Sequence, residues 1–190
     1  LMYSAGKAGD GRLALEGVIN SDLRYETGDA GSAALQLTYN TAFTQDGKTL
    51  VYLADYDSSD EAFTLFAVSV RELKKGNAEG TKIASGVDRF TMAEKADVLV
   101  YQKSGKLYRY DFKGDPEVIA KDVGSFYLGT YAISPDGSAV AYLKDADDWY
   151  DLYVYSAKSG DSEKIDSAVS AVYDYDETGG FKSMLYAKYN

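Results

Sequence analysis

The chain has 190 residues, of which 20 are basic and 30 acidic, so its formal net charge is −10. It contains no cysteine and no histidine. These counts exclude disulfides, thiol nucleophiles, thiolate zinc sites and a Ser-His-Asp triad from these residues. The acidic balance argues against a nucleic-acid partner, because affinity for a polyanion comes mainly from phosphate contacts made by Lys and Arg.

Tyrosine is unusually frequent, with 18 copies beside 7 phenylalanines and a single tryptophan. Tyrosine favours strands, because its ring packs on a pleated sheet while its hydroxyl reaches water. A tyrosine-rich, acidic chain without thiols is typical of extracytoplasmic β domains, so we expect a secreted, periplasmic or cell-surface location. No apolar run approaches the roughly 20 residues that span a bilayer, and we expect no transmembrane segment in this chain.

A triplet of two apolar residues and a tyrosine recurs five times along the chain. Its tyrosines are separated by 49, 49, 41 and 44 residues. A period in the forties is typical of a four-stranded propeller blade. The five copies are Leu1-Met2-Tyr3, Leu50-Val51-Tyr52, Leu99-Val100-Tyr101, Val140-Ala141-Tyr142 and Met184-Leu185-Tyr186.

Tight turns precede two of these triplets, and in both the glycine lies five residues before the tyrosine. The turns are Gln45-Asp46-Gly47 and Ser134-Pro135-Asp136-Gly137. Asp-Gly between two alternating apolar runs predicts a hairpin, since glycine supplies the positive φ that such turns need. Residues 92–97 form a degenerate copy without the glycine, and residues 175–180 form another with one extra residue.

In three of the repeats, two more strands follow the triplet. The third strand is predicted at Leu65-Phe66-Ala67-Val68, Leu107-Tyr108-Arg109-Tyr110 and Leu152-Tyr153-Val154-Tyr155. The fourth carries apolar residues four apart, which lie on one face of a strand. We therefore predict an all-β propeller of four-stranded antiparallel blades, with complete blades at 39–87, 88–123 and 124–169 and partial blades at 1–38 and 170–190.

One segment also fits a helix. From Phe63, the apolar residues Phe66, Val70 and Leu73 follow a helical spacing, with charged residues between them. The β-branched Val68 and Val70, together with the alignment to the other third strands, favour a strand instead.

The run SPDGSAVAYLKD, followed by YDLYVYSAKSG, resembles the repeat of TolB-type β-propellers. Their blades carry a Ser-Pro-Asp-Gly turn, an apolar-apolar-Tyr strand and a Leu-Tyr-x-Tyr strand. The matching residues here are Ser134, Pro135, Asp136, Gly137, Tyr142, Leu152, Tyr153 and Gly160. The repeat also looks like that of the propellers preceding prolyl-oligopeptidase catalytic domains. The resemblance covers about residues 39–190 and implies a fold, because such propellers serve many unrelated functions.

Closed propellers usually need four to eight blades, since each blade buries its faces against two neighbours. Three complete and two partial units suggest either that the ends combine to close a small ring or that the chain is a piece of a longer propeller. We favour the piece, so further blades from a longer parent chain are possible partners.

Three loops are rich in carboxylates, the oxygen ligands that Ca²⁺ prefers. None has the glycine or the closing glutamate of a Ca²⁺-binding loop, so we interpret them as solvated hairpin tips and predict no metal site and no cofactor. The loops contain Asp55, Asp57, Asp60 and Glu61; Asp145, Asp147, Asp148 and Asp151; and Asp174, Asp176 and Glu177.

No catalytic residues are predicted. The serines lack a histidine partner and a nucleophile-elbow motif, and no phosphate-binding glycine motif opens a helix. The candidate binding residues are Tyr56, Trp149 and Tyr150, which lie in or beside acidic loops. Exposed aromatic anchors suit protein partners or sugar rings, although such residues also cap strand ends and pack on a neighbouring blade.

The sequence therefore predicts a non-enzymatic propeller that binds a protein or a glycan. Two alternatives stay open. The chain could belong to the substrate-gating propeller of a larger prolyl-oligopeptidase-like peptidase, whose catalytic domain is absent here, or it could be a carbohydrate-binding module that uses its aromatic loop tips.

Overall fold

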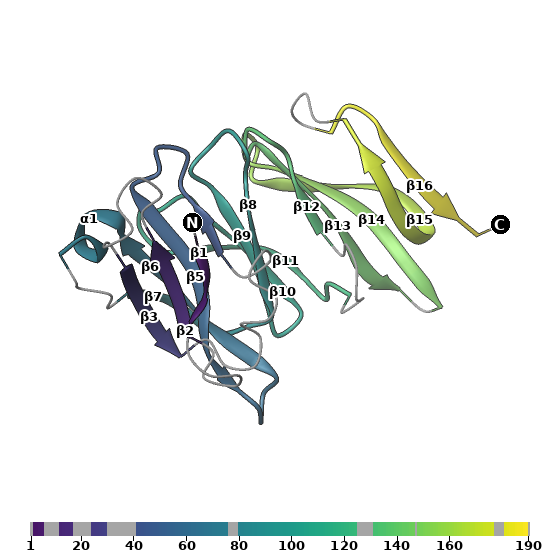
Figure 1. Cartoon of the computed structure of the whole chain (residues 1–190). Helices are drawn as coiled ribbons and strands as arrows, with labels where there is room; N and C mark the ends of the chain where they lie inside the picture. The colour runs from purple at the N-terminus through teal and green to yellow at the C-terminus, as the bar shows by residue number, and fades with distance from the viewer. Residues whose placement is uncertain are drawn as a thin grey trace. The chain divides into compact units, whose positions relative to one another are not determined.

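The computed structural model describes residues 2–5, 12–16, 24–29, 41–75, 80–124, 131–146, 148–176 and 181–189. The chain divides into two compact units, Leu1–Arg89 and Phe90–Asn190. Antiparallel strands make up almost all of the regular structure in the described residues (Figure 1). The predicted all-β class is confirmed. No helix within these ranges is long and apolar enough to cross a membrane.

The first unit contains two antiparallel sheets. One has the order β1-β2-β3, from Met2–Ala5, Arg12–Glu16 and Arg24–Asp29, which fall within the predicted partial blade 1–38. The other has the order β4-β5-β6-β7, from Thr41–Phe43, Thr49–Asp57, Ala62–Ser69 and Thr81–Val87. The second sheet has the four strands expected for residues 39–87.

The segment from Phe63 to Leu73, whose sequence fits both a strand and a helix, contains one of each. Strand β6 ends at Ser69, and one helical turn, α1, follows at Val70–Leu73. The Ser69 hydroxyl accepts a hydrogen bond from the Arg71 backbone N–H at 3.2 Å, which caps this turn. The turn buries Leu73 completely. The predicted strand is therefore confirmed up to Ser69. Beyond that residue, burial of Leu73 favours a helical turn over a continued strand.

The second unit also contains two sheets. One has the order β11-β10-β9-β8, from Glu117–Lys121, Lys106–Tyr110, Leu99–Lys103 and Arg89–Met92. The other has the order β12-β13-β14-β15-β16, from Tyr131–Ile133, Ala139–Ala146, Trp149–Ser156, Asp161–Tyr175 and Met184–Lys188.

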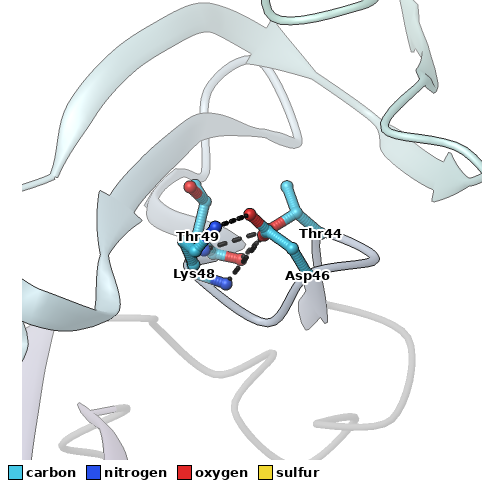
Figure 2. A network of polar contacts seen from close by, with 4 residues as sticks. All are labelled: Thr44, Asp46, Lys48 and Thr49. Carbon is cyan, nitrogen blue, oxygen red and sulfur yellow. Dashed lines mark hydrogen bonds and ion pairs between the residues drawn. The ribbon is translucent and has the colours of Figure 1, made fainter.

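The two Asp-Gly turns share one hydrogen-bond network. In the first, the Asp46 carboxylate accepts from the Thr44 hydroxyl and from the Lys48 backbone N–H, both at 3.0 Å, and the Thr44 hydroxyl oxygen accepts from the Thr49 N–H (Figure 2). Gly47 has a φ of 67°. The predicted hairpin turn is confirmed here, and the side chains of Thr44 and Asp46 close it by accepting hydrogen bonds from the backbone N–H groups of Thr49 and Lys48.

The second turn repeats these contacts. Asp136 accepts from the Ser134 hydroxyl at 2.7 Å and from the Ser138 N–H at 3.0 Å, and Ser134 accepts from the Ala139 N–H at 2.9 Å. Gly137 has a φ of 69°. In the degenerate copy, Ala93 stands where Thr44 and Ser134 stand, so no hydroxyl is present to form the network. The last copy lies partly outside the described residues.

In the three repeats that have all four strands, the tyrosine of the triplet lies opposite an aromatic residue of the third strand. Their rings stack at centroid distances of 4.8–5.5 Å, with interplanar angles of 2–19°. Cross-strand aromatic pairs stabilise a sheet beyond the area that they bury. The pairs are Tyr52–Phe66, Tyr101–Tyr108 and Tyr142–Tyr153.

The two sheets of the second unit pack face to face. Val100 and Leu107 from one sheet share a core cluster with Val140 and Tyr155 from the other. Partly buried Ile119 and Tyr153 extend this cluster. The Tyr155 hydroxyl also donates to the Glu117 carboxylate at 3.3 Å. The alternating residues of strands 99–103 and 139–146 thus divide between two faces, as period-two geometry requires.

Strand β15 crosses the predicted boundary between residues 169 and 170. Residues 161–175 contain neither glycine nor proline, so nothing interrupts the strand, although its register shifts between Val169 and Ala171. Packing changes at this point. Phe181, Met184 and Tyr186 cover the opposite face of the last sheet, where Ala141 and Leu152 lie. The strand segments 170–175 and 184–188 therefore form a two-stranded layer of their own.

Candidate functional site

Trp149 begins strand β14 and lies opposite Ala146, where the hairpin between β13 and β14 closes. The residue is 39% exposed to solvent. A rigid strand thus presents a large amphipathic ring to solvent. Such a ring suits a partner contact, because it loses little conformational entropy on binding.

Tyr189, immediately after β16, stacks on Trp149. The ring centroids are 3.9 Å apart, the interplanar angle is 16°, and Tyr189 is 54% exposed. The Tyr189 backbone N–H donates to the Ala168 carbonyl at 3.0 Å, which fixes the ring at the end of β16. We call Trp149 and Tyr189 the aromatic pair.

Tyr189 was not among the predicted site residues, although the repeats carry a signal for it. It lies three residues after the tyrosine of its triplet. The corresponding positions in the complete repeats are small or acidic: Asp55, Ser104 and Asp145. An aromatic residue at this position departs from the repeat and so serves something other than the blade.

A polar network lies on β15 and β16 next to Tyr189. The Asp166 carboxylate accepts from the Lys188 ammonium at 2.5 Å, from the Tyr186 hydroxyl at 2.7 Å and from the Ser167 N–H at 2.8 Å. These contacts, Lys188 first, lower the pKa of Asp166 from 3.8 to about 2. The same carboxylate raises the pKa of the Tyr186 hydroxyl. Asp166 therefore stays ionised at neutral pH and is a fixed negative group.

Tyr150 is half-buried, unlike Trp149. It packs against the cluster of Leu143, Leu152 and Val169. It also lies so close to Gly124 that a Cβ there would be 2.6 Å from the tyrosine ring. The structure thus places Trp149 and Tyr150 on opposite faces of β14, with Tyr150 in a packing position.

Tyr56 lies in the first unit, near the end of β5, and its ring contacts Phe63 at a centroid distance of 4.8 Å and an angle of 46°. It is exposed. The following turn is closed by Asp57, whose carboxylate accepts from the Ser59 hydroxyl at 2.6 Å and from its N–H at 2.8 Å. These bonds, the hydroxyl first, lower the pKa of Asp57.

Cation binding by the acidic loops requires several carboxylates to converge on one point. In the described part of the chain, no group of three or more acidic residues has a geometry that could hold a metal ion. Asp57 is engaged by Ser59, and Asp151 pairs with Lys164 at 2.7 Å. The side chains of Asp147, Asp174 and Glu177 lie outside the described residues.

A cavity of about 560 Å³ lies on the last sheet of the second unit. Its walls come from strands β14, β15 and β16 and from the turn before β16. Ile165, which is 43% exposed, lies in its lining, as do two carboxylates. Its lining residues include Val154, Asp161, Glu163, Ile165, Met184 and Tyr186.

No family model matches the chain, and no curated protein matches it. Solved structures do resemble it. A putative TolB from Agrobacterium tumefaciens is 16% identical, with a TM-score of 0.47 over 70% of this chain and 48% of that one. Oligogalacturonate lyase from Vibrio parahaemolyticus is 16% identical, with a TM-score of 0.51 over 70% and 41%. A puromycin-hydrolyzing peptidase from Mycobacterium tuberculosis is 16% identical, with a TM-score of 0.50 over 70% and 22%.

The chain spans less than half the length of each of these three proteins. At such low sequence identity, the likeness concerns the fold alone. We base the fold comparison on the lyase and the peptidase, which have the two higher TM-scores. With the repeated four-stranded antiparallel sheets, this likeness confirms the β-propeller fold that the repeats predict.

Proposed function

We propose that the chain is a non-catalytic β-propeller scaffold that binds a partner protein outside the cytoplasm. The observation that carries this proposal is the aromatic pair. Trp149 and Tyr189 are exposed, whereas the tyrosines of the repeated triplets, Tyr52, Tyr101 and Tyr142, are buried. Trp and Tyr are the residues that most often dominate the binding energy of protein interfaces.

Charge indicates the kind of partner. The chain carries a net charge of −10, so long-range attraction favours a basic protein and speeds its association. An arginine side chain suits the aromatic pair, since its planar guanidinium stacks on an indole face. The extracytoplasmic location is supported by the tyrosine-rich composition without thiols.

The decisive experiment compares capture of extracytoplasmic proteins by the wild-type chain and by Trp149→Ala and Tyr189→Ala. Phe43→Ala is the matched control, because Phe43 is as exposed as Trp149 but lies on β4 of the first unit. A captured protein is then purified and titrated. We expect both pair variants to weaken its binding about 30-fold or more, the scale of an interface hot spot, and Phe43→Ala to leave it unchanged.

Equal binding by the wild type and Trp149→Ala would contradict the proposal. A glycan array distinguishes the carbohydrate alternative. Specific glycan binding that is lost in Trp149→Ala, without a protein partner, would identify a sugar-binding module instead. Trp149 is the only tryptophan of the chain, so its fluorescence reports either ligand directly.

The peptidase likeness supports a second candidate function. A chain that covers 22% of a puromycin-hydrolyzing peptidase at a TM-score of 0.50 could serve as the gating propeller of a larger peptidase. The test is the sequence of the parent gene on both sides of these residues. A nucleophile-elbow motif, G-x-S-x-G, between a strand and a helix beyond further blades would favour this candidate over the scaffold.

A further inference from the structure

Three lysines lie side by side across three adjacent strands of the second unit. Lys106, at the start of β10, lies opposite Lys103 of β9 and opposite Lys121 of β11 (Figure 1). Residues that are directly opposite in an antiparallel sheet have Cβ atoms about 5 Å apart and point to the same face. We call Lys103, Lys106 and Lys121 the lysine row. Like charges placed directly opposite destabilise a sheet, so the row costs the free protein stability.

A tight hairpin fixes the place of the first two lysines. Ser104 and Gly105, which connect Lys103 to Lys106, have φ values of 48° and 68°. Two successive residues of this kind close the shortest hairpins. Lys106 and Lys121 are exposed, Lys103 is partly exposed, and Ser104 adds an exposed hydroxyl at the same end of the sheet. The sheet backbone thus holds three ammonium groups and a hydroxyl donor within reach of one ligand.

The lysine row lacks counter-charges. None of its ammonium groups forms an ion pair with a carboxylate in the described part of the second unit. Asp122 is next to Lys121 in sequence, but its carboxylate pairs with Lys144 at 3.6 Å. Residues 99–121, which contain β9, β10 and β11, carry five basic and three acidic side chains. This stretch therefore has a net charge of +2 in a chain whose net charge is −10.

The corresponding places in the other two repeats are neutralised or uncharged. In the sheet of β12 to β16, Lys144 and Asp151 lie opposite each other where Lys103 and Lys106 stand here. Asp151 also pairs with Lys164 of the next strand at 2.7 Å. In the first unit, the two places hold Ala54 and Thr64, which carry no charge. The blade architecture therefore does not require the lysine row, and an anionic ligand gives it a purpose.

We infer that the lysine row binds a compact anion with two or three linked phosphate groups. Lysine is a common phosphate ligand, since its ammonium group is a point charge with three N–H donors. Arginine, whose planar fork contacts a carboxylate at two points, is absent from the row. The outer two lysines stand two strand spacings, about 10 Å, apart at their Cα atoms. Their flexible stems close this distance, so the three ammonium groups converge on adjacent phosphates.

Charge favours a small ligand over a long polyanion. The Debye length is about 8 Å at physiological ionic strength, so a ligand no larger than the lysine row interacts mainly with the row. A longer polyanion extends over the rest of the chain, which has a net charge of −12 outside residues 99–121 and repels it. This inference goes beyond the proposed function, since it concerns another sheet and a small anion instead of the aromatic pair and a protein.

Isothermal titration of the full chain with sodium tripolyphosphate tests the inference. We expect saturable binding that weakens as salt is added, and binding of inorganic phosphate that is about 10-fold weaker or more, because a single phosphate reaches fewer ammonium groups. Lys106→Gln should weaken tripolyphosphate binding about 5-fold, the value of one exposed ion pair. Lys113→Gln is the matched control, since Lys113 is an exposed lysine between β10 and β11 and its loss changes the net charge equally. It should bind like the wild type.

A second variant separates loss of binding from loss of folding. Lys106→Asp copies the arrangement around Asp151, because it places one carboxylate between two lysines. Repulsion across the strands is replaced by attraction, so the melting temperature should rise by about 1–4 °C. The same change should abolish tripolyphosphate binding. A variant that is more stable and yet does not bind cannot have lost the ligand through misfolding.

Absence of saturable binding, an unchanged affinity in Lys106→Gln, or a lower melting temperature in Lys106→Asp would each overturn the inference. Citrate, a compact tricarboxylate, tests the phosphate chemistry, and equal affinity for citrate would overturn that assignment. Sedimentation with phosphatidylglycerol vesicles tests a lipid source. Vesicle binding that tripolyphosphate does not displace would overturn the assignment to a free anion. None of these measurements involves Trp149 or Tyr189, so failure of the proposed function leaves them intact.

Discussion

Gly137 lies so close to Val98 that a Cβ on the glycine would be 2.9 Å from the valine Cβ. The two residues belong to the turns before adjacent second strands of the same unit. A backbone hydrogen bond from the Lys95 N–H to the Pro135 carbonyl, at 2.7 Å, joins the same two turns. Gly137 therefore meets two requirements at once, a positive φ in its hairpin and a close approach to a neighbouring turn.

Gly137→Ala tests these requirements against Gly105→Ala. Both glycines have a φ of 68–69°, but a Cβ on Gly105 would meet no atom within 4 Å. We expect Gly105→Ala to lower the free energy of unfolding by about 1–2 kcal/mol, the cost of a left-handed conformation for alanine. Gly137→Ala should cost about 1–3 kcal/mol more, because its methyl group overpacks Val98. Urea unfolding of both variants measures the difference, and equal losses would contradict the close approach.

Ala168 offers a substitution that should stabilise the protein. Its φ is 56°, and the residues at the same place in the other fourth strands, Gly86 and Asp122, also have positive φ. Ala168→Gly should raise the free energy of unfolding by about 1 kcal/mol, since glycine adopts this conformation without strain. Ala171→Gly, in the same strand at a residue without positive φ, should lower it by about 0.5–1 kcal/mol. Opposite signs in chemical denaturation confirm that the left-handed conformation of Ala168 is strained, and a loss in Ala168→Gly argues against it.

Alkaline pH should destabilise the chain through its stacked tyrosines. Burial, with a smaller effect from Tyr108, raises the pKa of Tyr101 from 10 to about 12. The fold favours the neutral phenol, so its contribution is complete below pH 10 and is lost as the pH rises from 10 to 12. Tyr101→Phe should lose about 1 kcal/mol less stability than the wild type between pH 9 and pH 11. Parallel unfolding at both pH values checks this, and equal losses would refute it.

Asp166 should titrate in acid well below an ordinary carboxyl. Its pKa is lowered to about 2 by the Lys188 ammonium first and then by the Tyr186 hydroxyl. A lowered pKa means that the contribution of Asp166 to stability is present above pH 4 and disappears as the pH falls towards 2. Carbon-detected NMR of the carboxyl gives the midpoint directly. Lys188→Ala should move it back towards 3.8, whereas Lys182→Ala, which removes a lysine outside this network, should not.

The repeats predict most of the fold because they report side-chain patterns that local geometry enforces. The stacking of Tyr101 on Tyr108, for example, follows from their places in two adjacent strands. The turns at Asp46 and Asp136 form because the glycine that follows each of them adopts a positive φ without strain. In these places the sequence pattern and the structure express the same constraint.

The remaining features depend on contacts between segments that are distant in sequence. The turn at Val70–Leu73 forms because burial of Leu73 outweighs a strand pattern that continues through Val70. Similarly, Trp149 was a candidate binding residue from its exposed loop, but its partner Tyr189 lies 40 residues later and outside the repeat pattern. Periodicity describes one segment at a time, so it does not reveal which rings meet across strands.

The continuity of β15 has a consequence for cooperativity. Residues 161–169 hydrogen-bond to β14, while residues 169–175 hold β16 and the layer that covers the other face of the same sheet. A single backbone thus belongs to two layers, so strain or unfolding in one is transmitted to the other without an intervening loop. The final hairpin and the sheet beneath it should open as one unit, with similar protection against hydrogen exchange on both sides of Val169.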